Sequence, residues 1–123
     1  MLIIRDEQMD TLRNYMQQRF EDLMVVHLNQ YFPRQCETLG EENLRRTIRY
    51  GIEQASTYAI DVELDVSRYL NLMFTFGRDF DRDRQLPWAS SILTRKDFSS
   101  GARKMDALYE EAAKHVPQAE KSL

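Results

Sequence analysis

The sequence predicts an all-α protein, a compact single-domain helical bundle of about five helices that spans residues 1–123. Apolar residues recur at steps of three and four, the spacing that lines one face of a helix. Only four glycines and three prolines interrupt the chain, which favours a few long helices over many short strands. The length fits one domain that can bury a core of its own.

The first helix is predicted over residues 6–32. Its expected apolar face is Met9, Leu12, Met16, Phe20, Leu23, His27 and Tyr31. The pair Phe32-Pro33 ends this helix, because a residue before proline is driven out of the α region.

A second helix is predicted over about residues 39–59, since Thr38 and Glu41 have the spacing of a capping box. Its expected apolar stripe is Leu44, Ile48, Ile52, Ala55 and Ala59. Gly51 lies mid-helix, where glycine costs up to about 1 kcal/mol relative to alanine. One physical reason to tolerate that cost is the close approach of another helix backbone at Gly51.

The third helix is predicted over about residues 62–76, with Asp61 as its N-cap. Gly77 stops it, because glycine adopts the left-handed position after a helix end without a Cβ penalty. Val66, Tyr69, Leu70, Met73, Phe74 and Phe76 crowd one broad side of it. This segment is therefore expected to form the centre of the core.

Pro87 and Trp88 begin a fourth predicted helix, over about residues 87–95, because proline suits the first turn. Ser99 or Ser100 is expected to cap a fifth, from about 101 to 115. Its expected apolar face is Ala102, Met105, Leu108, Tyr109 and Ala112. Residues 116–123, which include Pro117, are expected to form a flexible tail.

Composition narrows the class of protein. The net charge of −3 argues against a nucleic-acid binder or an anionic-membrane binder. The arginines at 45 and 46 each follow a glutamate by four residues, as in ordinary helix-surface ion pairs. The apolar stretch of the N-terminus MLIIRDEQMD is too short for the apolar region of a signal peptide. The sequence also has no run of about 18 apolar residues, the length that a membrane-spanning helix needs. We expect a soluble, cytoplasmic protein.

The loop between the third and fourth helices is the first candidate for a partner-binding surface. It comprises Arg78, Asp79, Phe80, Asp81, Arg82, Asp83 and Arg84, with Trp88 following. An EF-hand calcium loop would need glycine and glutamate where this chain has Arg84 and Ser90. Arginines in this pattern pair with aspartates of the loop or with carboxylates of a partner. Phe80 and Trp88 are typical of a core, but they flank a polar loop, and an exposed tryptophan or arginine there would form a binding hot spot.

No catalytic or metal-binding pattern stands out. His27 lies on an apolar helix face and is expected to be a partly buried histidine, and His115 is expected to interact with its own helix end. Neither belongs to a metal-ligand motif. Cys36 is the only cysteine, so an intramolecular disulfide is impossible, and a structural thiol is the favoured interpretation. No cofactor and no metal are expected.

Six phrases of the sequence resemble a group of small bacterial α-helical proteins encoded beside genes for type VI secretion effectors and their spike or PAAR-type components. They are IRDEQMDTL, HLNQYFPRQC, IRYGIEQASTYAI, DVSRYLNLMFTFGRDFD, LPWASSIL and KMDALY. The resemblance covers nearly the whole chain. It implies a small cytoplasmic partner of a secreted toxin. The group has no established catalytic motif, so the resemblance assigns no residue a role.

The leading hypothesis is a non-enzymatic protein-binding accessory protein of a bacterial toxin or type VI secretion effector system. Its partner would be a cognate effector or a delivery component, and its role that of an immunity protein, chaperone or adaptor. One alternative is a small helical enzyme that depends on a metal or ligand and is centred on His27. Another is a structural homo-oligomer, whose sign would be an apolar patch left exposed on the bundle.

Overall fold

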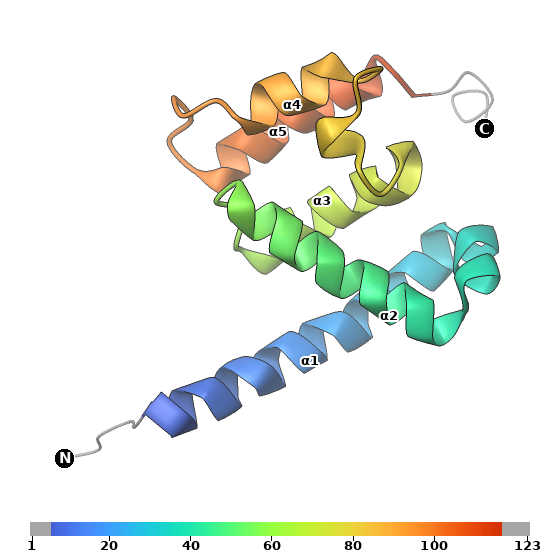
Figure 1. Ribbon diagram of the computed structural model, residues 1–123, viewed down its shortest axis with the longest axis vertical. Coiled ribbons are helices and arrows are strands. Elements are labelled where there is room, and N and C mark those ends of the chain that lie inside the picture. Colours follow the sequence, from blue (N-terminus) through green and yellow to red (C-terminus); the bar gives the residue numbers. More distant parts are fainter. Residues whose placement is uncertain (1–5, 117–123) are drawn as a thin grey trace. The chain divides into compact units, whose positions relative to one another are not determined.

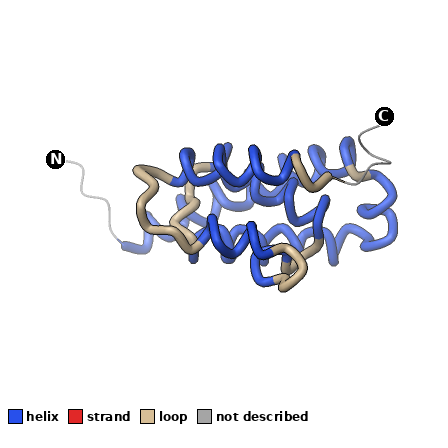
Figure 2. Tube along the Cα trace, turned by 90° about the horizontal axis from the view of Figure 1, so that it is seen from above, coloured by secondary structure: helices blue, strands red, loops and turns tan. Residues whose placement is uncertain are grey.

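The computed structural model describes residues 6–116, and these residues form five α-helices and one short 3₁₀-helix without any strand (Figure 1, Figure 2). The all-α prediction is therefore confirmed. Residues 117–123 of the predicted tail lie outside the described residues. The chain divides into two compact units, Met1–Ile48 (unit 1) and Arg49–Leu123 (unit 2). Among the described helices, none combines the length and the apolarity that a membrane span requires.

Helix α1 covers Asp6–Tyr31, close to its predicted bounds. Helix α2, Pro33–Thr57, begins at once after Phe32, so an additional helical segment over residues 33–39 precedes the predicted helix. The helix predicted over about residues 39–59 corresponds to the part of α2 after Gly40, residues 41–57. Pro33 explains both the end of α1 and the start of α2. It disfavours the α conformation in the residue before it, yet it fits the first turn of a new helix, where its missing N–H would have no partner.

Gly40 interrupts α2 with φ 79° and ψ 159°, so that residues 33–39 and 41–57 form two helical segments. A positive φ of this size is readily adopted only by glycine. Thr38 lies inside the first segment and donates its hydroxyl hydrogen to the carbonyl of Arg34 at 3.0 Å. It therefore does not cap a helix, and the predicted capping box with Glu41 is wrong.

The buried side of α1 differs from the predicted face. Of that face only Phe20 is buried, whereas Met9, Leu12, Met16, Leu23 and Tyr31 are exposed and His27 is half-buried. The buried positions are Phe20, Glu21, Met24 and Leu28. Apolar residues occupy more than one side of this helix, and periodicity does not say which side finds a packing surface. From residue 9 to residue 19 every side chain is exposed.

Arg45 ties the two helices of unit 1 together. Its guanidinium lies 3.0 Å from the buried Glu21 carboxylate, 2.8 Å from Asp22 and 3.4 Å from Glu41. The hydrogen bond from Arg45 holds the pKa of Asp22 below its usual range. A buried carboxylate is tolerated only where charge and hydrogen bonds compensate its lost hydration.

Replacing Arg45 with methionine is therefore expected to lower the thermal unfolding midpoint of unit 1 markedly, because the buried Glu21 loses its ion pair with Arg45. Arg46→Met is the matched control. Arg46 makes one exposed i,i+4 pair with Glu42 at 2.8 Å, and such pairs contribute little. Circular dichroism across a temperature ramp measures both effects. Equal shifts for the two variants would contradict the role of Arg45.

In unit 2, Gly51 of α2 faces α3, which covers Glu63–Phe76. A Cβ added to Gly51 would lie only 2.7 Å from Met73 Sδ and would also overlap Leu70. The prediction that another helix backbone approaches Gly51 is wrong, because only side-chain atoms of α3 lie close to this position. Helix α2 ends at Thr57, so Ala59, predicted on the apolar stripe, lies in a turn with φ 62°.

The start of α3 differs from its prediction. Val62, not Asp61, occupies the N-cap position, and no side chain caps this end. The helix stops where expected, at Gly77, whose φ of 122° and ψ of 154° favour glycine and whose N–H donates to the Met73 carbonyl at 2.8 Å.

A 3₁₀-helix, η1 (Phe80–Arg82), follows in the segment predicted as loop. Helix α4 (Pro87–Leu93) begins at the predicted proline but ends before the predicted residue 95. Helix α5 (Gly101–Ala113) is capped by Ser100, whose Oγ accepts from the Arg103 N–H at 3.2 Å, as predicted. Helices α4 and α5 lie side by side, and both α3 and α4 contact their neighbours α5 and η1 (Figure 1).

The core of unit 2 centres on α3, as predicted. Its buried apolar members include Val66, Tyr69, Leu70, Met73, Phe74, Phe80, Leu93, Met105 and Leu108. Arg68 links α3 to α5 through an ion pair of 2.8 Å with Asp106, and it pairs at 2.8 Å with Asp65 on its own helix. Ala102, which was predicted on the apolar face of α5, is exposed.

Candidate functional site

Phe80, which was predicted as part of the partner-binding surface, is a core residue. Its side chain is 1% exposed, and its ring centroid lies 5.1 Å from that of Tyr69. One turn of 3₁₀-helix places Phe80 and Asp81 inward. The removal of this large ring from water is favourable enough to explain why the segment folds against α3 instead of remaining an open loop.

Asp81 is also buried, which rules it out as a partner-contact residue. Its side chain is fully buried, and its Oδ2 accepts a hydrogen bond from the Tyr58 hydroxyl at 2.7 Å. Arg82 Nε lies 3.8 Å from the same oxygen. Oδ1 has no hydrogen-bond partner among the described residues. The Tyr58 hydroxyl therefore provides much of what keeps this carboxylate stable inside the unit.

Burial, and then the hydrogen bond to Asp81, raises the pKa of Tyr58 to about 12. An unfolded tyrosine releases its proton near pH 10. Between about pH 10 and 12 the folded chain thus holds a proton that the unfolded chain has lost, so stability falls as the pH rises.

We expect the unfolding midpoint to fall more steeply across this alkaline range in the unaltered chain than in Tyr58→Phe. The variant keeps the other tyrosines but has no titrating hydroxyl at position 58. Thermal unfolding at a series of pH values measures the two slopes. Identical slopes would contradict the assignment.

Three of the remaining loop charges, Arg78, Asp79 and Arg82, engage Tyr50 or one another at the surface. Tyr50 donates its hydroxyl hydrogen to Asp79, and Arg82 donates to the Tyr50 oxygen at 2.9 Å and to Asp79 at 3.1 Å. The Arg78 guanidinium lies 4.0 Å above the Tyr50 ring, a cation–π geometry. The Tyr50 hydrogen bond lowers the pKa of Asp79. The salt-bridged loop is thus the arrangement found.

Trp88 is half-buried and not an exposed anchor. It packs edge-on against Phe76, with centroids 5.3 Å apart, and stacks on His115 at 5.1 Å. His115 Nε2 lies 3.4 Å from Glu111, one turn earlier in the chain. Asp83 accepts from the Gln85 N–H at 2.9 Å, a local turn. The exposed residues of the predicted surface are five of its charged ones: Arg78, Asp79, Arg82, Asp83 and Arg84.

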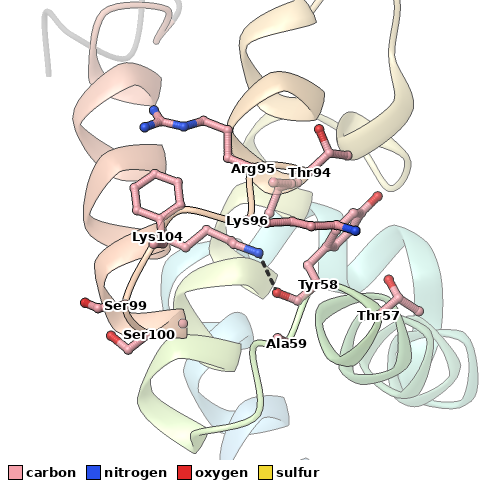
Figure 3. A pocket seen from close by; sticks show the side chains of 12 residues that line it. Thr57, Tyr58, Ala59, Thr94, Arg95, Lys96, Ser99, Ser100 and Lys104 are labelled. Carbon is pink, nitrogen blue, oxygen red and sulfur yellow. Dashed lines mark hydrogen bonds between the residues drawn. The ribbon is translucent and has the colours of Figure 1, made fainter.

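A cleft of about 590 Å³ lies in unit 2 where the α2–α3 turn, the α4–α5 link and the first turn of α5 meet (Figure 3). Its lining carries the cations Arg95, Lys96 and Lys104. Figure 3 shows Lys104 directed at the Tyr58 carbonyl, to which it donates at 2.8 Å. Arg95 pairs with Asp97 at 2.6 Å. Lys104 thus ties the first turn of α5 to the α2–α3 turn, and Arg95 pairs within the α4–α5 link. Sequence reasoning missed this cleft because its two lining stretches, residues 57–59 and 93–104, lie far apart in the chain.

Among the described residues, no group of three or more histidine, cysteine, aspartate or glutamate side chains could hold a metal ion. His27 lies against its neighbour Tyr31, with ring centroids 4.8 Å apart. Cys36 is buried, and burial raises the pKa of its thiol, which disfavours the nucleophilic thiolate.

The exposed apolar side of α1 is the largest departure from an ordinary surface. We call Met9, Leu12, Met16, Leu23 and Val26 the α1 face. Its members are between 39% and 66% exposed, and the rings of Tyr15 and Tyr31 are exposed on the same helix. No protein-family model, curated protein or solved structure matches this chain. The function must therefore be inferred from the residues themselves.

Proposed function

We propose that this chain is a non-enzymatic protein-binding protein, and that the α1 face is its binding surface. The observation that carries the proposal is the exposure of large apolar side chains along one helix. Scattered exposed apolar residues are ordinary, but a contiguous set on one element is typical of an interaction site. Covering it would recover about 25 cal/mol for each Å² of apolar surface removed from water.

The α1 face is better supported than the loop at residues 78–84. Phe80 and Asp81 are buried, and the Arg78, Asp79 and Arg82 side chains are engaged with Tyr50 or with one another. A partner would have to break these pairs before it gained any contact. At the α1 face, association replaces only contacts with water.

The class of partner is proposed from the sequence resemblance. It would be a bacterial effector, toxin or delivery component, which the chain would serve as an immunity protein, chaperone or adaptor. A chaperone would cover an apolar surface of its client, and the α1 face has the chemistry for that task. An immunity protein would use the same face to anchor itself over a toxin's active site.

The test is co-purification of the tagged full chain with the products of its neighbouring genes, followed by mass measurement with light scattering. We expect a stoichiometric complex that Leu12→Glu weakens about tenfold or more, because a charge enters an apolar contact. Asn14→Glu is the matched control, since it adds the same charge on the opposite side of α1. Equal binding by both variants would contradict the assignment of the α1 face as the binding surface. The absence of a complex with any neighbouring gene product would contradict the proposed class of partner.

A further inference from the structure

The α1 face continues through Arg19 into a heptad pattern. Met9, Leu12, Met16, Arg19, Leu23 and Val26 follow one another at alternating steps of three and four. This is the a/d spacing of a coiled-coil seam, in which the apolar stripe keeps facing a partner helix as the two helices supercoil. All six side chains are exposed. The seam is thus present without a partner helix among the described residues.

We propose that α1 pairs antiparallel with α1 of a second copy of this chain, through the seam from Met9 to Val26. The spacing of the seam is the same when it is read from either end. A two-fold axis between Met16 and Arg19 therefore places Met9 opposite Val26 of the second copy, and Leu12 opposite Leu23. Each a position then meets a d position, and the whole seam is matched.

Arg19 selects the antiparallel orientation. In a parallel pair, the two Arg19 side chains would face each other in the middle of the seam, and like charges at that distance repel. In the antiparallel pair, Arg19 lies opposite Met16. Its aliphatic stem can cover the thioether while the guanidinium reaches water. Tyr15, one turn before Arg19, offers a ring for cation–π contact.

The local stability of α1 also calls for a partner. Every residue from 9 to 19 is exposed, so this half of the helix buries little surface within unit 1. Isolated helices of such length are marginal in water. Antiparallel pairing over residues 9–26 would cover about 27 Å of helix at 1.5 Å per residue and pack this half against a second copy.

This inference rests on the proposed function in one respect, that α1 is a protein-binding surface. The inference adds that a second copy of this chain is what binds the α1 face. A different protein that binds the α1 face would have to displace the second copy, so the free chain keeps its apolar seam covered until such a partner arrives.

The test is sedimentation equilibrium of the full chain over roughly two decades of concentration. We expect a reversible monomer–dimer equilibrium. Leu12→Glu alone, or Leu23→Lys alone, should weaken dimerisation about tenfold or more by placing a charge against leucine. Combining both changes in one chain should restore the dimer, because the new carboxylate and the new ammonium face each other only in the antiparallel register.

The combination of Asn14→Glu and Gln17→Lys is the control, since it adds the same two charges outside the seam and should leave dimerisation unchanged. Circular dichroism checks that every variant is folded. A chain that is monomeric throughout overturns the inference, and so does a double variant that dimerises no better than the single ones. If the chain is monomeric but Leu12→Glu still abolishes capture of a neighbouring gene product, the proposed function survives. If it dimerises and captures nothing, the proposed effector partner fails and the inference stands.

Discussion

Replacing Phe80 with alanine is expected to lower the free energy of unfolding of unit 2 by about 3–4 kcal/mol, the usual cost of truncating a buried phenylalanine. Its ring is 1% exposed and packs on Tyr69, so the variant loses apolar burial and leaves a cavity beside α3. Urea unfolding followed by fluorescence measures the effect. Trp88, the one tryptophan of the chain, lies in unit 2 and reports on that unit.

Arg84→Ala is the matched control for Phe80→Ala. Arg84 lies four residues further along the same segment and is exposed, so the change should stay within about 0.5 kcal/mol. The comparison separates a core residue from a surface hot spot. If Phe80→Ala left stability intact and weakened partner binding instead, the assignment of Phe80 to the core would be wrong.

Gly51→Val is expected to destabilise unit 2 by about 3 kcal/mol. A side chain at Gly51 would overlap Leu70 and would lie 2.7 Å from Met73 Sδ at its first atom alone. Overpacking of a filled core costs about 1–3 kcal/mol, and valine adds a second and third carbon beyond that atom. The gain in helix propensity when glycine is replaced is less than about 1 kcal/mol. The cost of overpacking is larger, so the net change in the free energy of unfolding is destabilising.

Glu53→Val provides the comparison for Gly51→Val, because it introduces the same β-branched residue at an exposed position of α2. It should cost only the difference in helix propensity, about 0.5 kcal/mol. Urea unfolding measures both variants. A neutral effect at Gly51 would mean that Leu70 and Met73 move aside freely, and it would contradict the close packing of α2 against α3.

The helices could be predicted from the sequence wherever a local rule had one meaning. Gly77, Pro87 and Ser100 each mark a helix end in the structure as they do in the sequence. Pro33 shows the limit, because proline both ends the helix before it and can begin the next. The end of α1 before Pro33 can be read from the sequence alone. The start of α2 at Pro33 depends on whether the turn after it packs against another part of unit 1.

Burial was the harder property to predict, at α1 and at η1. Periodicity identifies which residues share a helix face, but the face that is covered depends on another element, and α1 has apolar residues on more than one side. At Phe80 and Asp81, a single 3₁₀ turn is too short to produce a periodic signal. The alternation of arginine and aspartate correctly suggested ion pairs. It could not reveal that Tyr58 reaches in from α2's end to hold Asp81.

The burial of Cys36 allows the opening of unit 1 to be measured by chemical modification of its thiol. It is the only thiol of the chain, it is 4% exposed, and burial raises its pKa. A thiol-specific reagent in excess can therefore modify it only when the surrounding helices open. The rate of modification under native conditions reports how often unit 1 opens. Comparison of that rate with the unfolding seen by Trp88 in unit 2 tells whether the two units open as one or separately.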